Sequence, residues 1–464
     1  MNLLDNILLW LLVTFLGITL LFLIALYIRG AFRWRAVLHI ENAIAPQDDS
    51  FISVVESLSK SLETKGTIVN FWETAADIQQ ARIKAIESAE RSIQFETFIM
   101  TPGNRAQNLA AALSKKAHDG IHVQMLVDSL GCREMPSKYW SRLRSAGVEV
   151  VHFNPFDWRA PANFSGRTHR KLLIIDSNKV LIGGAGISDL WDGTQKPDDT
   201  QPWLDIEVAL VGDVVGTLAA CFQMHWQGHR RGDQVTGIDM SKIYPPSTQP
   251  TTNEQSKEPD KESAKKPKRE SQEKNQADKS SPILVVPGSK PNYRSSSIER
   301  LKEVVIACAR ERIWLASPYF LPNQSSRQLL ISAKQAGLDV RILTTSARSD
   351  KKPVYYASYE VYGPLLEAGI QIFEFQPSML HAKMLIIDQD WVNTGSANFD
   401  YRSFLHNDEL DIFVQSPQLV NSVEQVFKKG FSQSQQIGLR QWQRRSIIKH
   451  RVLGNAVRLI QWQL

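Results

Sequence analysis

The feature that most constrains this chain is one short pattern that occurs twice. The pattern is His-x-Lys-x4-Asp, and two segments carry it: His169-Arg-Lys171-Leu-Leu-Ile-Ile-Asp176 and His381-Ala-Lys383-Met-Leu-Ile-Ile-Asp388. Each copy has an apolar interior, and each reaches a glycine seven residues after its Asp, at Gly183 and Gly395. A single copy would be weak evidence, because three fixed residues recur by chance. Two matched copies predict that the chain contains a duplication.

The segments before each motif repeat as well. Residues 108–118 have helical spacing and lead through Gly120 to an apolar, β-prone stretch at 122–128. Residues 326–335, Gly337 and residues 339–345 repeat this order. Strands that alternate with helices in both halves predict an α/β fold with two similar lobes, at 66–240 and 283–435.

The spacing within each motif places its polar groups together. Residues i and i+2 of a β-strand point to one face, so the His and the Lys of a motif lie side by side. The Asp ends the strand and starts a turn, where a structural role is favoured over proton chemistry. The following glycines, Gly183, Gly184 and Gly395, would allow the backbone to approach a ligand closely.

If a pseudo-twofold axis relates the lobes, two imidazoles and two ammonium groups converge. This set of groups suits a phosphodiester. One His attacks phosphorus, the other protonates the leaving oxygen, and the lysines offset the phosphate charge. Asp205 and Glu409 occupy equivalent positions before apolar strands and are candidates to orient the two rings. This chemistry needs no metal or cofactor.

Residues 1–35 are expected to form an N-terminal membrane anchor. The stretch 7–28 is uncharged and rich in Leu, Ile, Phe and Val, which is about the length that a transmembrane helix needs. A cleaved signal peptide fits less well, because no basic residue precedes the stretch and no small-residue cleavage site follows it. Arg29, Arg33 and Arg35 follow the span, so the positive-inside rule predicts a single-pass protein of the inner membrane whose body is cytoplasmic.

Two further segments differ from the lobes in composition. Residues 245–282 are rich in Lys, Glu, Ser, Gln and Pro, which predicts a disordered linker. Residues 438–464 alternate basic and apolar residues, which fits a basic amphipathic helix on an anionic membrane or a helix packed on the body. The chain has 54 Lys and Arg against 48 Asp and Glu, a mild excess that suits phospholipid or nucleic acid but also an ordinary soluble surface. Its three cysteines are widely spaced, which indicates a reduced compartment.

These motifs resemble the phospholipase D superfamily, and within it the bacterial cardiolipin synthases, over most of residues 66–435. The stretches that carry the resemblance are the two motifs, Gly183-Gly-Ala-Gly-Ile187, Pro202-Trp-Leu-Asp205, Gly395-Ser-Ala-Asn-Phe-Asp-Tyr-Arg-Ser403 and Asn407-Asp-Glu409. The resemblance implies an αβαβα sandwich for each lobe, a phosphohistidine intermediate, and transfer of a phosphatidyl group from one phospholipid to another without a metal. It assigns His169 as nucleophile and His381 as acid and base.

One position departs from the family pattern. Ser396 and Asn398 fit the family's phosphate-binding positions in the second half, and Gly184 fits in the first, but Gly186 stands where Asn is usual. The first half is therefore expected to lack one amide donor toward the phosphate.

Three functions remain open from the sequence. The leading hypothesis is a membrane-tethered phosphatidyltransferase acting on anionic phospholipids, with no nucleic-acid partner expected. A phospholipase D or phosphodiesterase that hydrolyses phospholipid or nucleic acid would use the same residues. A catalytically weakened membrane scaffold is the third, and the intact His and Lys residues of both motifs argue against it.

Overall fold

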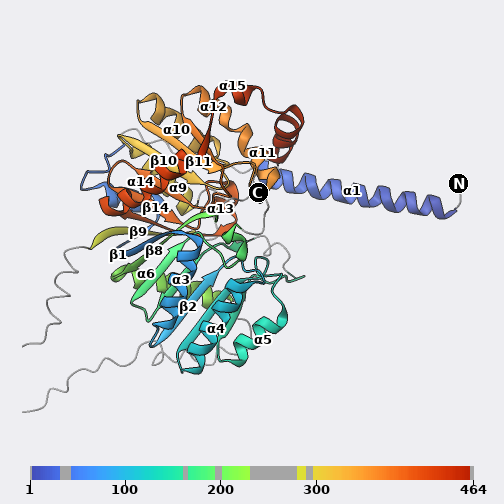
Figure 1. Ribbon diagram of the computed structural model, residues 1–464. Coiled ribbons are helices and arrows are strands. Elements are labelled where there is room, and N and C mark those ends of the chain that lie inside the picture. Colours follow the sequence, from blue (N-terminus) through green and yellow to red (C-terminus); the bar gives the residue numbers. More distant parts are fainter. Residues whose placement is uncertain are drawn as a thin grey trace, which may run out of the picture.

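The computed structural model describes residues 3–31, 43–159, 166–193, 201–229, 280–288 and 296–459. The body consists of two lobes (Figure 1), which we call the first lobe (residues 62–229) and the second lobe (residues 281–437). The predicted linker lies outside the described residues except at its end, where Ser281 and Pro282 already belong to strand β9.

The elements of the two lobes follow the same order along the chain. Two helices precede the first lobe: α1 (Leu3–Ala31) and α2 (Phe51–Ser59). The first lobe contains β1 (Leu62–Thr74), α3 (Ala75–Glu87), β2 (Ser92–Thr97), α4 (Asn104–His118), β3 (His122–Asp128), α5 (Ser137–Ser145), β4 (Glu149–Phe153), β5 (Arg167–Thr168), β6 (Leu172–Ile175), β7 (Lys179–Gly183), the 3-10 helix η2 (Asp189–Asp192), β8 (Leu204–Val211) and α6 (Asp213–His229). The second lobe contains β9 (Ser281–Pro287), α9 (Ser297–Cys308), β10 (Arg312–Ser317), α10 (Gln324–Gln335), β11 (Asp339–Thr345), α11 (Lys352–Glu360), α12 (Tyr362–Glu367), β12 (Gln371–Phe375), β13 (Met384–Ile387), β14 (Trp391–Gly395), α13 (Tyr401–Leu405), β15 (Asn407–Asp408), β16 (Leu410–Gln415), α14 (Pro417–Ser432) and β17 (Ser434–Ile437).

The strands of both lobes form one continuous sheet with an internal twofold pattern. Outward from its centre, the first lobe runs β1-β8-β7-β6-β2-β3-β4 and the second runs β9-β16-β14-β13-β10-β11-β12. The two series match strand for strand, and β17 adds to the second. The prediction of two duplicated α/β lobes related by a pseudo-twofold is therefore confirmed.

The central pair of strands joins the lobes. Strands β1 and β9 are antiparallel, with Leu62 opposite Val285 and Gly66 opposite Ser281. At Gly66 any larger side chain would press on Val214 and Ile283, so the strand needs glycine there. Main-chain hydrogen bonds along this pair fix the register of the lobes and hence the relative position of the two motifs.

A buried ion pair is duplicated along with the strands. Arg82 of α3 pairs with Glu207 of β8 and donates to the carbonyl oxygen of Ala185 at 3.0 Å. In the second lobe, the Lys302 ammonium lies 3.2 Å from an Asp411 oxygen and 2.9 Å from the carbonyl oxygen of Ala397. Each helix thus holds the loop that follows its motif, through charges that are almost fully buried.

Two terminal segments lie outside the lobes. Within α1, the stretch Asp5–Ala25 is long and apolar enough to cross a membrane, and none of it is buried against the rest of the chain. The C-terminal segment is three short helices, not the single amphipathic helix that was one alternative. These are α15 (Leu439–Gln443), the π-helix η3 (Ile447–Gly454) and α16 (Asn455–Leu459).

One face of this segment packs on α11. The His450 ring lies 4.5 Å from the Tyr359 ring, and the indole N–H of Trp442 donates to the carbonyl oxygen of Tyr359 at 2.7 Å. Arg445 pairs with Glu360 in the same interface.

Candidate active site

Each motif places its His and Lys immediately before a buried strand. His169 and Lys171 precede β6, and His381 and Lys383 precede β13. All residues of both strands are buried, because each lies in the middle of its lobe's half of the sheet. The apolar strand cores thus fix the backbone from which the polar side chains project.

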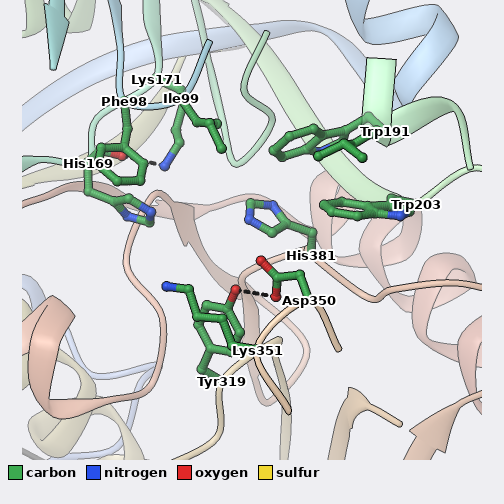
Figure 2. Close-up of a pocket in the computed structure, with 11 residues that line it drawn as sticks. Phe98, Ile99, His169, Lys171, Trp191, Trp203, Tyr319, Asp350, Lys351 and His381 are labelled. Atoms are coloured by element: carbon green, nitrogen blue, oxygen red, sulfur yellow. Dashed lines mark hydrogen bonds between the residues drawn. The ribbon is translucent and has the colours of Figure 1, made fainter. Parts of the chain in front are cut away.

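The two histidines line one cavity of about 100 Å³ between the lobes. Figure 2 shows their rings facing each other across it. Lys171 also lines the cavity, and Lys383 is buried beside His381, with its ammonium 2.8 Å from Nδ1 and 3.1 Å from Nε2. The geometry therefore brings together the imidazoles and ammonium groups that the duplication predicted would converge.

The carboxylates that bind the histidines come from the opposite lobe. Nδ1 of His169 lies 2.9 Å from Oε2 of Glu409, and Nδ1 of His381 lies 2.7 Å from Oδ2 of Asp205. A main-chain hydrogen bond also joins the two lobes here, since the amide of His381 donates to the carbonyl oxygen of Leu204 at 2.8 Å. Because a carboxylate accepts hydrogen bonds, Nδ1 carries the ring proton and Nε2 keeps the lone pair.

Burial and neighbouring charges keep both rings neutral. Burial and, less strongly, the charge of Lys383 lower the pKa of His381 to about 4, although Asp205 opposes the shift. Burial, with the charge of Lys171, also holds the pKa of His169 well below its usual value. At neutral pH each Nε2 is therefore unprotonated, which is the form that can attack phosphorus or accept a proton.

The other charged groups respond to the same environment. Burial alone would raise the pKa of Asp205, but His381 and Lys383 lower it to about 2. Burial raises the pKa of Glu409, against the charge of Lys171 and a hydrogen bond from Ser396. The pKa of Lys383 falls to about 8 because of burial, which the nearby carboxylates partly oppose.

The two orienting carboxylates receive a second hydrogen bond from different donors. The Ser396 hydroxyl donates to Oε2 of Glu409 at 2.5 Å. At the equivalent position in the first lobe, Gly184 has no side chain, and any Cβ there would overlap the Asp205 carboxylate. The indole N–H of Trp191 donates to Oδ2 of Asp205 instead, at 3.1 Å. A tryptophan from η2 therefore does in the first lobe what a serine does in the second.

The departure at Gly186 has a steric explanation. A Cβ at Gly186 would overlap the side chain of Ile99 and come within 3.2 Å of the Trp191 ring. The space that Asn398 fills in the second lobe is therefore filled by Ile99 and Trp191 in the first. The first lobe lacks the amide, as expected, and gains apolar lining at the same place.

Several predicted site residues are in the motif framework but do not line the cavity: Asp176, Asp388, Gly183, Gly184, Gly395, Ser396 and Asn398. Asp176 accepts from the amides of Glu90, Arg91 and Ser92, and Asp388 accepts equivalently from Arg310, Glu311 and Arg312. Both aspartates thus fix the turn between a helix and strand β2 or β10.

At Gly183 and Gly395 the backbone lies close to a neighbouring strand of the sheet. A Cβ at Gly183 would meet the carbonyl oxygen of Ile206 in β8. A Cβ at Gly395, whose φ is +151°, would meet the carbonyl oxygen of Leu410. These glycines let β7 and β14 pack against the strands that lead from the orienting carboxylates.

The sequence did not single out most of the other cavity residues, which are Phe98, Ile99, Leu190, Trp191, Trp203, Tyr319, Asp350 and Lys351. Phe98 and Ile99 come directly after β2, and Tyr319 lies two residues after the end of β10. Their place just beyond the ends of strands, where functional loops concentrate, was the available signal. Among the described residues, no group of three His, Cys, Asp or Glu side chains is arranged to hold a metal ion.

Comparisons with known proteins agree with this geometry. A family model described as "Cardiolipin synthase, PLD-like domain" matches residues 83–190 and 304–430. The chain is 29% identical over 427 residues to a cardiolipin synthase of Geobacillus thermodenitrificans (strain NG80-2), which covers 92% of this chain and 75% of that protein. It is 30% identical over 407 residues to cardiolipin synthase 2 of Bacillus anthracis, and this match covers 87% of this chain and 71% of that protein.

A solved structure supports the fold. The phosphatidylserine synthase of Haemophilus influenzae Rd KW20 has a TM-score of 0.62 to this chain, at 13% identity, over 89% of this chain and 99% of that one.

Proposed function

The chain belongs to the family of phospholipase D-like cardiolipin synthases, and from this premise we propose that it is a phosphatidyltransferase that joins two phospholipids. The observation that carries the proposal is the exchange of carboxylates between lobes. Each histidine is held by a carboxylate of the other lobe, so that two neutral imidazoles face one cavity with two lysines beside them. The cavity has room for a phosphate and the adjoining headgroup atoms, and the acyl chains remain outside it.

The proposed reaction has two steps. Nε2 of His169 attacks the phosphorus of the donor lipid, a P–N bond forms, and the P–O bond to the headgroup alcohol breaks. When the anionic phosphate lies beside it, His381 takes up a proton from solvent at Nε2 and gives this proton to the leaving oxygen. Lys171 and Lys383 offset the charge on the nonbridging oxygens. The hydroxyl of the acceptor lipid then gives its proton to His381 and attacks phosphorus, which breaks the P–N bond and frees His169.

The lipid product tests the proposed function. We would express the chain in bacteria that lack cardiolipin synthase and analyse total lipids by mass spectrometry, with His169→Ala and His381→Ala as controls. New cardiolipin that disappears in both variants supports transfer. Phosphatidic acid without cardiolipin would indicate hydrolysis and overturn the proposal, as would an unchanged lipid profile in cells that contain the folded protein.

Acid and alkali treatment tests the intermediate. A phosphoramidate is stable in alkali and labile in acid, so we would quench the purified enzyme in alkali after mixing it with a lipid labelled in the phosphatidyl group. Label is expected on the wild type and, more slowly because the acid is missing, on His381→Ala, but not on His169→Ala. Label that persists in His169→Ala would reassign the nucleophile.

We also propose that α1 anchors the chain in the inner membrane with the lobes on the cytoplasmic side. The supports are the exposed apolar stretch Asp5–Ala25 and the arginines that follow it. Protease added to intact spheroplasts is then expected to leave the lobes uncut. Digestion of the C-terminal half from outside would contradict this orientation.

The C-terminal helices are proposed to touch the membrane with the face that does not pack on α11. On that face Ile447, Ile448 and Val452 are each more than 60% exposed, and Lys449 and Arg451 are exposed between them. A fluorophore on Ile448→Cys is expected to shift to the blue in anionic vesicles, and the same label on Met224→Cys, an exposed site on α6, is not. The native cysteines are buried and do not compete for label. Equal shifts at both sites would refute the proposal.

A further inference from the structure

The cavity walls break the twofold symmetry that the sheet and motifs obey. On the first-lobe side the wall is Ile99, packed against Gly186, together with the Trp191 and Trp203 rings beside His381. The position that corresponds to Ile99 in the second lobe is Tyr319, because β2 and β10 pair with β3 and β11 in the same register. One wall is apolar and the other carries a phenol.

The second-lobe wall also carries two charged side chains from outside the motifs. Asp350 and Lys351 lie in the loop between β11 and α11 and line the cavity with Tyr319. Figure 2 shows the three side chains together on one side of the imidazole pair, across from Lys171. The corresponding loop of the first lobe, residues 129–136, is fully described and contributes nothing to the cavity lining.

Contacts within this group hold it in place. The Tyr319 hydroxyl donates to Oδ1 of Asp350 at 2.6 Å, and the Lys351 ammonium lies 5.0 Å from the centre of the Tyr319 ring. No carboxylate oxygen of the described residues lies within ion-pairing distance of this ammonium. The charge of Lys351 reaches the catalytic centre, since it adds to the larger effect of burial in lowering the pKa of His169.

The charges in the cavity exceed what one phosphodiester requires. A diester carries a single negative charge, and Lys171 already faces the cavity, with Lys383 buried beside His381. A third ammonium, close by but outside the motifs, suits a second anionic group. The neighbouring carboxylate, fixed by Tyr319, suits a hydroxyl donor next to that group.

We propose that Tyr319, Asp350 and Lys351 form the acceptor site, which selects a phospholipid with a hydroxyl-bearing, anionic headgroup. Lys351 binds the phosphate of the acceptor lipid, and Asp350 accepts a hydrogen bond from a hydroxyl of its headgroup. Phosphatidylglycerol has this chemistry. The inference rests on the proposed function and adds to it the residues outside the motifs that bind the second substrate.

Two reactions with the same donor separate the acceptor site from the chemistry. Purified full-length enzyme in mixed micelles of phosphatidylglycerol would form cardiolipin, for which the acceptor is anionic. With radiolabelled glycerol added, it would also exchange glycerol into phosphatidylglycerol, for which the acceptor is neutral. Both reactions share the donor, His169 and His381, and differ only in what attacks the phosphatidyl-enzyme.

The informative variant is Lys351→Ala. The variant loses the hydrogen bond between the Lys351 ammonium and the phosphate of the acceptor lipid, and glycerol has no such phosphate. Cardiolipin formation is therefore expected to fall about tenfold more than glycerol exchange. Phosphatidic acid should rise relative to cardiolipin as water replaces the lost acceptor. Lys351→Arg should restore most of the ratio, and Lys352→Ala, the exposed neighbour outside the cavity, should leave it unchanged.

Other outcomes overturn the inference. If both reactions of Lys351→Ala fall by the same factor, Lys351 acts on the reacting phosphate and not on the acceptor. If neither reaction changes, it has no part in binding. If the wild-type enzyme carries out neither reaction, both the proposed function and this inference are refuted. This failure can be told apart from a failure of the inference alone, because it is seen before any residue is substituted.

Discussion

Replacing Glu409 with glutamine tests whether a carboxylate from one lobe activates the histidine of the other. The Glu409 side chain is fully buried, and its Oε2 lies 2.9 Å from Nδ1 of His169. Glutamine keeps the shape and removes the charge. A hydrogen bond to a charged group contributes roughly 1.5–3 kcal/mol, and each 1.4 kcal/mol changes a rate about tenfold. The expected loss in kcat is therefore about 10- to 150-fold, with little change in KM.

The assay is the initial rate of cardiolipin formation from labelled phosphatidylglycerol, with thermal unfolding to verify the fold. Asp205→Asn is the matched variant, because it removes the equivalent charge from His381. The two variants should differ in the alkali-quenched label. Glu409→Gln slows formation of the labelled enzyme, and Asp205→Asn also slows its discharge. A correctly folded Glu409→Gln protein with the wild-type rate would refute the view that the lobes activate each other's histidines.

Three further predictions concern charge and packing. Activity should fall as pH rises through about 8, where Lys383 loses its proton. Lys383→Arg should move this alkaline limb of the pH–activity profile to higher pH. If the limb does not move, Lys383 is not the group that titrates there. Gly186→Asn should destabilise the protein by about 1–3 kcal/mol through overlap with Ile99, and adding Ile99→Ala should recover part of the loss in a thermal melt; a neutral single variant would contradict the steric account. Arg82→Ala should lower the free energy of unfolding in denaturant by about 3–5 kcal/mol, because it leaves the buried Glu207 carboxylate unpaired. Lys428→Ala, which removes the more exposed ion pair with Glu424, should lower it by at most about 1 kcal/mol. Equal effects of the two substitutions would refute this distinction.

The duplicated framework could be predicted from sequence because it depends on local patterns. Strands β3 and β11 occur at the predicted residues 122–128 and 339–345, and each has the buried apolar residues that made it recognisable. Helix boundaries were less accurate. Helix α4 begins at Asn104, although apolar spacing indicated a start at residue 108.

The exchange of carboxylates could not be predicted in the same way. Asp205 and Glu409 occupy equivalent positions, so the sequence alone allows either carboxylate to serve either histidine. The choice depends on the β1–β9 pair that joins the lobes, and neither strand was identified as the centre of the sheet. Lys351 was missed for a related reason. It lies in a loop whose sequence is not repeated in the first lobe, so a comparison of the two halves of the sequence does not identify it.

We therefore expect the positions that depart from the repeat to determine which substrates the cavity accepts. The twofold framework supplies two histidines, two lysines and two buried carboxylates, which are the groups that the proposed exchange at phosphorus uses. The differences between Ile99 and Tyr319, and between Gly186 and Asn398, all lie at or just behind the cavity wall. A single lobe would hold a histidine without its carboxylate, so the site needs two lobes. Two lobes in one chain can diverge, which allows one side of the cavity to differ from the other. An enzyme that must distinguish a leaving alcohol from an incoming lipid requires that difference.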